Sequence, residues 1–265
     1  MTFVINTTKK DIAEKMISNG QNVLITGATG SGKSTFCLEL AENLDMKPFM
    51  INFGSTQDAR VTLIGSRELI DGNTPFVKSE FVNQIQQENT LIILDELSRG
   101  SDDAFNIVFP LLDFRKELFI DETGETIKIP DSVRFIATAN VGSEYSATRS
   151  IDRALNDRFI TFRLGYMNGK ELFNYATEKF TLSDTQETEL DKSCKVYDFV
   201  KNLFDKDEIS TRISPRIILN TVGLLEDFTY AEVFDNVISC YFEEDTSMSG
   251  ELNSIRMFMD SNGIK

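Results

Sequence analysis

The sequence predicts an α/β protein with a five-stranded parallel sheet, followed by a small all-helical domain. Up to about residue 166, short apolar segments alternate with segments of helical periodicity. This alternation is typical of a parallel sheet covered by helices on both faces. After residue 167 only helical periods remain. We therefore expect an α/β domain over residues 1–166 and a helical domain, called the lid domain below, over residues 167–265.

The expected strands are short runs rich in Val, Ile, Leu and Phe, as required of strands that are buried on both faces. They lie at 21–27, 47–54, 90–96, 133–140 and 159–165. Helices of the α/β domain are expected at 9–18, 33–44, 79–89 and 102–114. Those of the lid are expected at 169–180, 187–204, 214–225, 230–242 and 251–259.

Two β-hairpins are expected as insertions in the α/β domain. Asp71-Gly72-Asn73 separates two short extended segments, which predicts a hairpin over about 67–79. Thr123-Gly124 does the same within residues 117–130.

Composition and charge exclude several classes of function. The chain has 27 basic and 42 acidic residues, a net charge of −15, which disfavours general nucleic-acid binding through clustered Lys and Arg. It has no histidine and three widely spaced cysteines, so we expect no transition-metal site and no histidine acid–base chemistry. No apolar run approaches the ~20 residues of a membrane span. The N-terminus does not resemble a secretory signal, so we expect a cytoplasmic protein without a membrane partner.

The segment GATGSGKST, residues 27–35, matches the phosphate-binding pattern G-x-x-x-x-G-K-[ST] between an expected strand and an expected helix. Its glycines allow successive backbone N–H groups to point at one anion, and the helix adds the positive end of its dipole. Lys33 is expected to reach the outer phosphates, and the Ser34 hydroxyl to bind Mg²⁺. The residues expected to bind ATP here are Gly27, Thr29, Gly30, Ser31, Gly32, Lys33, Ser34 and Thr35.

The apolar segment LIILDE ends in the carboxylates Asp95 and Glu96. Ligands of open α/β sheets bind at the carboxyl ends of the strands. Asp95 is therefore expected to hold Mg²⁺, directly or through water, and Glu96 to polarise the attacking water. The alternative is that the pair caps the next helix. A glutamate beside the magnesium aspartate favours hydrolysis over phosphate transfer to a metabolite.

With these motifs the chain resembles the AAA+ ATPases. The segment VRFIATAN ends in Asn140, which resembles that family's sensor 1 residue and would orient the water near the γ-phosphate. The alternative is an asparagine that begins a turn. The segments INFGSTQDARVTLIG and SEFVNQIQQENTLIILDE, with the two hairpins, resemble the MoxR/CbbQ/CobS-like (dynein-related, helix-2-insert) group, and most of all the cobaltochelatase CobS-type motor subunit. The resemblance covers roughly residues 20–225.

The segment STRISPRIILNT resembles the Ser-Pro-Arg motif of the cobaltochelatase motor subunit. The resemblance implies that Arg216 is the sensor 2 residue, acting on the nucleotide of its own subunit. Pro215 favours the first turn of a helix, which would place Arg216 in that turn. Arg212 is a second candidate, and either arginine could instead be a surface residue that pairs with acidic neighbours.

Three arginines lie within TRSIDRALNDRF, residues 148–159. On a helix over 149–157, Arg149 and Arg153 each have an aspartate at a spacing of three or four, so both have local ion-pair partners. Arg158 has none at helical spacing. The segment ALNDRF resembles the family's segment that presents an arginine finger to the neighbouring subunit. The resemblance implies that Arg158 is the trans-acting finger, with Arg153 or Arg149 as a second contact to the nucleotide.

The resemblance implies an ATP-hydrolysing motor with ATP and Mg²⁺ as cofactors. It would form a homo-oligomeric ring, usually a hexamer, and remodel a protein partner or complex in a chaperone- or chelatase-like role. A client or adaptor with a metal-ion-adhesion domain would be a separate chain. The alternatives are a nucleic-acid-directed motor of the restriction or DNA-handling type, a nucleotide-dependent scaffold, and a small-metabolite kinase. A composition rich in Ile, Phe, Asn and Lys is typical of an AT-rich genome such as that of a phage.

Overall fold

The computed structural model describes residues 7–55, 58–140, 157–243 and 250–264. The chain forms two compact units, an α/β unit made mainly of residues up to Leu164 and a helical unit made mainly of residues from Gly165 onward. Each unit is described by itself.

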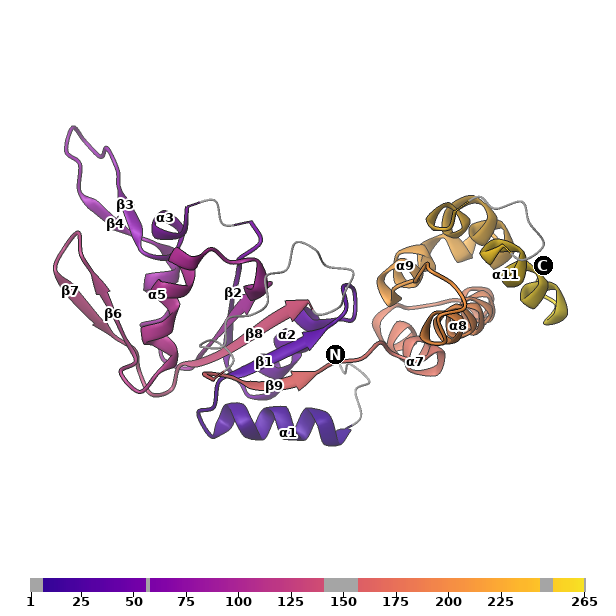
Figure 1. Cartoon of the computed structure of the whole chain (residues 1–265), viewed down its shortest axis with the longest axis horizontal. Coiled ribbons are helices and arrows are strands. Elements are labelled where there is room, and N and C mark those ends of the chain that lie inside the picture. Colours follow the sequence, from indigo (N-terminus) through magenta and orange to yellow (C-terminus); the bar gives the residue numbers. More distant parts are fainter. Residues whose placement is uncertain (1–6, 56–57, 141–156, 244–249, 265) are drawn as a thin grey trace. The chain divides into compact units, whose positions relative to one another are not determined.

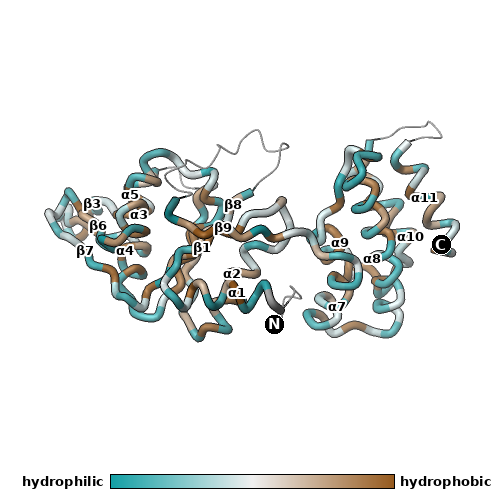
Figure 2. Tube along the Cα trace, turned by 60° about the horizontal axis from the view of Figure 1, so that its bottom comes forward, coloured by the Kyte–Doolittle hydropathy of each residue, from teal (hydrophilic) through white to brown (hydrophobic). Residues whose placement is uncertain are grey.

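The α/β unit is built on a five-stranded parallel sheet (Figure 1). Its strands are β1 (Val23–Gly27), β2 (Lys47–Asn52), β5 (Thr90–Asp95), β8 (Arg134–Asn140) and β9 (Ile160–Arg163). Their order is β2-β5-β8-β1-β9, and every pairing is parallel. All residues of β1 and β5 are buried, in agreement with their apolar sequences, and β1 is brown in Figure 2. The predicted fold class is confirmed.

Four main helices accompany this sheet: α1 (Thr7–Ser18), α2 (Lys33–Asn43), α4 (Glu80–Gln84) and α5 (Asp102–Leu112). Two short helices were not expected, α3 (Ala59–Leu63) and the 3-10 helix η1 (Leu97–Arg99). The Asp58 carboxylate caps α3 by accepting a hydrogen bond from the Val61 N–H at 3.1 Å. The helix expected over 79–89 is shorter than predicted, because the chain turns at Asn89, which has a φ of 59° and leads into β5.

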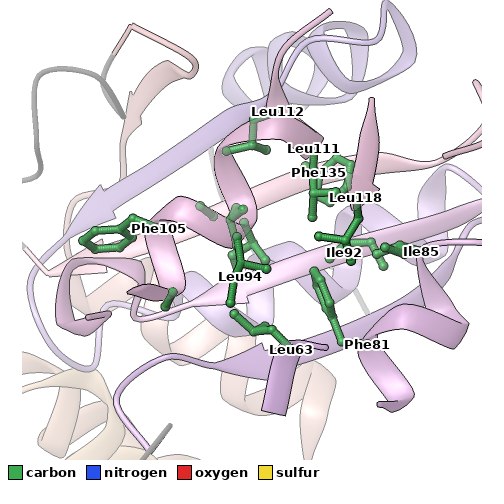
Figure 3. Packing of buried hydrophobic residues seen from close by; sticks show 14 of the residues in the cluster. Leu63, Phe81, Ile85, Ile92, Leu94, Phe105, Leu111, Leu112, Leu118 and Phe135 are labelled. Carbon is green, nitrogen blue, oxygen red and sulfur yellow. The ribbon is translucent and has the colours of Figure 1, made fainter. Parts of the chain in front are cut away.

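The core of the α/β unit lies where α3, α4 and α5 pack on the sheet (Figure 3). The buried side chains labelled there are Leu63, Phe81, Ile85, Ile92, Leu94, Phe105, Leu111, Leu112, Leu118 and Phe135. Since the neighbouring strands β5 and β8 and all three helices contribute to this cluster, it holds the carboxyl ends of β5 and β8 in fixed positions relative to each other.

Two antiparallel hairpins extend from the same end of this unit (Figure 1). The first joins β3 (Gly65–Arg67) to β4 (Phe76–Lys78), and the second joins β6 (Glu117–Ile120) to β7 (Glu125–Lys128). Lys78 Nζ lies 2.7 Å from a Glu125 carboxylate oxygen, so one partly exposed ion pair joins the two hairpins. Arg60 of α3 lies 2.6 Å from Glu122 and 3.3 Å from Asp121, which joins the second hairpin to α3.

The helical unit contains α7 (Gly169–Lys179), α8 (Asp184–Asp205), α9 (Pro215–Thr221), α10 (Tyr230–Val233) and α11 (Glu251–Ser261). Short turns η2 (Val222–Glu226), η3 (Phe234–Ile238) and η4 (Ser239–Tyr241) connect them. The helix expected over 230–242 is interrupted by the π-helical turn η3. The unit has its own core, which includes Leu172, Tyr197, Ile218, Tyr230, Phe234 and Ile255. Among the helices that the structure describes, none has both the length and the apolar character needed to cross a bilayer.

Candidate nucleotide site

The phosphate loop connects β1 to α2 at the carboxyl edge of the sheet. Gly30 and Gly32 have φ angles of 76° and 85°, a left-handed conformation that favours glycine. The Ser31 hydroxyl is buried and has no hydrogen-bond partner among the described residues. A buried polar group without a partner is costly, so this hydroxyl fits a loop that is completed by a polar ligand.

Lys33, the first residue of α2, places a positive charge inside the loop. Its side chain is buried, and Nζ donates hydrogen bonds to the carbonyl oxygens of Ala28 at 2.8 Å and Gly27 at 3.2 Å. The ammonium is thus folded back onto its own loop, beside the N-terminus of α2. Two cationic features, the ammonium and the helix dipole, therefore meet where a phosphate would bind.

Asp95 ends β5 and accepts three side-chain hydrogen bonds. Ser34 Oγ and Thr138 Oγ1 each donate to Oδ1 at 2.7 Å, and Asn52 Nδ2 donates to Oδ2 at 3.3 Å. The structure thus joins Ser34 and Asp95, which are 61 positions apart in the chain. Their hard oxygen atoms are the ligand type that Mg²⁺ prefers.

Sequence analysis missed two residues of this cluster, Asn52 and Thr138. Asn52 is the last residue of β2, and Thr138 lies two residues before Asn140 on β8. Both are polar residues at or near the carboxyl end of an apolar strand, which was the signal that could have identified them.

Glu96 follows Asp95 in a left-handed conformation, with φ 52° and ψ 39°. For a residue with a side chain this costs about 1–2 kcal/mol. The Glu96 N–H donates to Thr138 Oγ1 at 2.9 Å, and the carboxylate pairs with Arg99 at 3.1 Å. Neither acidic residue caps a following helix: η1 has no side-chain cap, and Ser101 caps α5. The capping alternative therefore does not describe this pair.

Asn140 ends β8, the strand between β5 and β1. It is buried and lies opposite Gly27 in the parallel register, next to the first residue of the phosphate loop. Asn140 thus shares the carboxyl edge of the sheet with Asp95, Ser34 and Lys33.

Arg158 lies at the amino ends of the parallel strands, which we call the amino edge of the sheet. It precedes β9, where Ile160 pairs with Val23, while Gly27 is four residues further along β1. At about 3.3 Å per residue this step spans roughly 13 Å. The guanidinium carbon of Arg158 lies 4.7 Å from the centre of the Phe109 ring. Arg158 is therefore not placed to reach the phosphate loop of its own chain. Arg149 and Arg153 lie outside the described residues.

The charge of Arg158 also acts on a neighbouring carboxylate. Hydrogen bonds from Arg115 lower the pKa of Asp113, burial opposes this shift, and the nearby Arg158 lowers the pKa further. Asp113 is therefore ionised at neutral pH.

Arg212 and Arg216 differ in their surroundings. The Arg212 guanidinium lies 4.1 Å from the Phe204 ring centre and 4.9 Å from that of Tyr166, and 3.8 Å from an Asp205 oxygen. It is thus packed within the helical unit. Arg216 is exposed in the first turn of α9, directly after Pro215.

Cys37 of α2 lies behind the phosphate loop. Burial raises the pKa of its thiol, and the charge of Asp95 raises it further. The thiol is therefore neutral and unreactive, and it acts as an apolar packing residue.

Comparisons with known proteins agree with this arrangement. Residues 22–159, just over half of the chain, match the family model of the AAA domain (dynein-related subfamily). Uncharacterized proteins of Staphylococcus saprophyticus and Staphylococcus aureus are 24% and 23% identical over 255 residues, which is 92% of this chain and 93% of each relative.

Two solved structures share the fold. NtrX from Brucella abortus, in complex with ADP, has a TM-score of 0.59 at 13% identity, over 96% of this chain and 59% of that chain. A protein of Cytophaga hutchinsonii with the provisional name ATPase has a TM-score of 0.51 at 20% identity, over 66% of this chain and 52% of that chain. This chain thus spans less than two thirds of either solved chain. Together, the sheet order, the loop and the family match show that the chain belongs to the dynein-related subfamily of AAA domains and is an ATP-hydrolysing enzyme.

Proposed function

We propose that this ATPase is a ring-forming motor of the MoxR/CobS type, with ATP and Mg²⁺ as cofactors, that remodels a partner protein or complex. The observation that carries the proposal is the separation of polar groups between the two edges of the sheet. Lys33, Ser34, Asp95 and Asn140 meet at the carboxyl edge, while Arg158 lies at the amino edge. An enzyme that uses Arg158 in catalysis must therefore bring it from another subunit.

At the carboxyl edge each residue has a distinct task. The N–H groups of residues 29–35 and the Lys33 ammonium bind the phosphates. Ser34 and Asp95 would hold Mg²⁺, which would neutralise phosphate charge. Glu96 polarises the attacking water, and Asn140 orients it near the γ-phosphate. Thr138 and Asn52 orient the Asp95 carboxylate through their hydrogen bonds.

Arg158 supplies positive charge to the nucleotide of the next subunit, so hydrolysis depends on ring assembly. Its packing against Phe109 supports this role, because the stacked ring limits the orientations open to the guanidinium. Arg153 or Arg149 assists it.

Arg216 is the lid arginine that senses the nucleotide of its own subunit. The exposure of Arg216 and the packing of Arg212 on two aromatic rings support this choice. Arg212 instead stabilises the lid.

The client is a protein or protein complex, with a metal-ion-adhesion adaptor as one candidate. Two features support a protein client. The net charge is −15, and the linked hairpins expose apolar side chains, with Leu69 77% and Phe119 55% accessible. A nucleic-acid client predicts instead that DNA or RNA stimulates hydrolysis and that salt weakens the stimulation.

Mixing two inactive variants tests the proposal. Glu96→Gln keeps the finger but lacks the water-polarising group, and Arg158→Ala has the reverse defect. In an equimolar mixed ring about a quarter of the sites combine an intact Glu96 with an intact neighbouring Arg158, so about a quarter of wild-type turnover should return. Light scattering with ATP should give about six times the 30.0 kDa chain mass.

The control is each variant mixed with itself, which should stay inactive. If both variants assemble and their mixture stays inactive, Arg158 does not act between subunits. If wild-type protein turns over ATP as a monomer, the ring model is wrong.

A further inference from the structure

Asn22, the residue before β1, bridges two other segments at the amino edge of the sheet. Its Nδ2 donates hydrogen bonds to the carbonyl oxygen of Leu112 at 2.8 Å and to that of Arg158 at 3.1 Å. Leu112 is the last residue of α5 (Figure 3), and Arg158 precedes β9. These partners lie 90 and 136 positions from Asn22 in the chain, so the bridge is a purely tertiary contact.

The chemistry of an asparagine suits this position. Its amide nitrogen carries two hydrogens and can donate to two acceptors at once. The Leu112 carbonyl lies at the end of a helix, where the last carbonyl groups have no partner within the helix. The main-chain carbonyl of Asn22 also accepts a hydrogen bond from the Ile160 N–H at 2.8 Å. Asn22 therefore holds the start of β9 through its backbone and the Arg158 carbonyl through its side chain.

Arg158 is thus held at two points that both belong to α5 or are tied to it. Its backbone is tied through Asn22 to Leu112, and its guanidinium carbon lies 4.7 Å from the ring centre of Phe109. Phe109 precedes Leu112 by three residues, so the two lie on the same side of the helix. The Phe109 ring is itself stacked on that of Phe105, with 6.4 Å between their centres. A long side chain can be aimed only from a fixed backbone, and Asn22 supplies that fixed point.

We propose that Asn22 is a positioning residue for Arg158, fixing the backbone from which the guanidinium is presented to the nucleotide of the next subunit. The proposal rests on the proposed role of Arg158 as a trans-acting finger. The phosphate loop of the same chain begins at Gly27, at the other end of β1 and roughly 17 Å away at about 3.3 Å per residue. Asn22 therefore serves the site of the neighbouring subunit and not that of its own.

Asn22→Ala removes both donors and leaves the Arg158 backbone less firmly held. Turnover should fall about tenfold, as expected for the loss of two hydrogen bonds between neutral groups, while ATP affinity stays unchanged. Asn22→Asp keeps the shape of the side chain but places acceptor oxygens opposite two carbonyl groups. Its turnover should be lower than that of Asn22→Ala.

Mixed rings show whether the defect lies in the finger or in the nucleotide site. In an equimolar mixture with Glu96→Gln, the partner chains supply well-held fingers to the intact sites of Asn22→Ala. Turnover should then reach about a quarter of wild type, about five times the mean of the two variants measured apart. In a mixture with Arg158→Ala, neither chain supplies a well-held finger, so turnover should equal the mean of the two. General destabilisation of Asn22→Ala would not produce this contrast.

A matched control lies at the same edge, on the other side of the sheet. Asn89 precedes β5, and its side-chain amide donates to the Asp45 carbonyl oxygen. Asn89 also has a φ of 59°, a conformation that alanine adopts less readily. Asn89→Ala should therefore lower the unfolding midpoint but leave turnover unchanged, which separates loss of stability from loss of positioning.

Wild-type turnover in Asn22→Ala overturns the proposal, as does a mixture with Glu96→Gln that gives only the mean of the two variants. If Asn22→Ala fails to fold, Asn22→Ser, which keeps one donor, decides by the same mixtures. The mixture of Glu96→Gln with Arg158→Ala separates the two levels of the argument. If it stays inactive, the trans-acting role of Arg158 is wrong. If it recovers while the mixture of Glu96→Gln with Asn22→Ala does not, only the positioning role of Asn22 is wrong.

Discussion

The two edges of the central sheet differ in how their polar groups are held. At the carboxyl edge, Asp95, Thr138 and Asn140 are buried and joined to neighbouring strands by short hydrogen bonds or by register. At the amino edge, Arg158 rests on an aromatic ring, and the nearby Phe114 side chain is 93% accessible. The first edge is a buried network of hydrogen bonds within one chain. The second holds a half-buried cation beside an exposed apolar side chain, which is a combination that suits contact with another protein.

The largest effect should come from the amino edge. Arg158→Ala should lower turnover by a factor on the order of 10³, because the charge that an arginine finger supplies develops its full value only in the transition state. ATP affinity should be nearly unchanged, as measured by fluorescence of a nucleotide analogue. Loss of ATP binding in this variant would contradict the proposal, because it would mean that Arg158 is needed to bind the nucleotide.

Glu96→Gln removes a carboxylate from the carboxyl edge of the sheet. The amide keeps the shape but cannot polarise water as a carboxylate does, so steady-state turnover should fall by a factor on the order of 10² or more. The variant should still bind ATP and form the same oligomer. An unchanged rate would assign water activation to another residue.

Thr138→Val tests whether the buried network at the carboxyl edge orients Asp95. The substitution keeps the side-chain volume and removes a donor to Asp95, and leaving a buried polar group short of a partner costs about 1–3 kcal/mol. We expect about a tenfold loss of turnover and a lower unfolding midpoint by circular dichroism.

Thr90→Val is the matched control on β5. The Thr90 hydroxyl is buried and has no hydrogen-bond partner among the described residues, so this substitution should not destabilise the protein. Equal effects of the two substitutions would show that the hydrogen bonds of Thr138 have no special role.

The smallest effect should follow from Phe109→Leu at the amino edge. The substitution removes a cation–π contact worth about 0.5–2 kcal/mol, so the guanidinium of Arg158 is held less firmly in position. Turnover should fall about threefold while ATP affinity stays constant. Phe119→Leu on the exposed hairpin face is the control. A tenfold weaker ATP affinity in Phe109→Leu would indicate a general structural role for this ring.

Elements with strong local patterns were predicted well. The five apolar strands depend on residues that are close in the chain, and the structure places them where expected. The residues at which helices end were predicted less well. The apolar spacing of Phe81, Val82 and Ile85 does not reveal that the helix stops at Gln84, because the turn at Asn89 is set by the start of the neighbouring strand.

The candidate site shows the same limit more clearly. The acidic pair could be recognised, but not the orientation of the Glu96 carboxylate, because this carboxylate lies against Gly54, which follows the neighbouring strand β2. Likewise, the packing of Arg212 on two aromatic rings could not be read from sequence, because Tyr166 comes from a distant segment and Phe204 from the preceding helix α8.

By itself, the sequence determined the phosphate loop and the succession of strands and helices, since backbone freedom at glycine and hydrophobic periodicity are properties of neighbouring residues. Only the tertiary structure decided which strand ends meet. The register of β1, β5 and β8 brings Ser34 to Asp95 and Asn140 to Gly27, and the direction of β9 places Arg158 at the far edge. Parallel pairing is a non-local interaction, so these positions follow from packing of the whole sheet and not from any one segment.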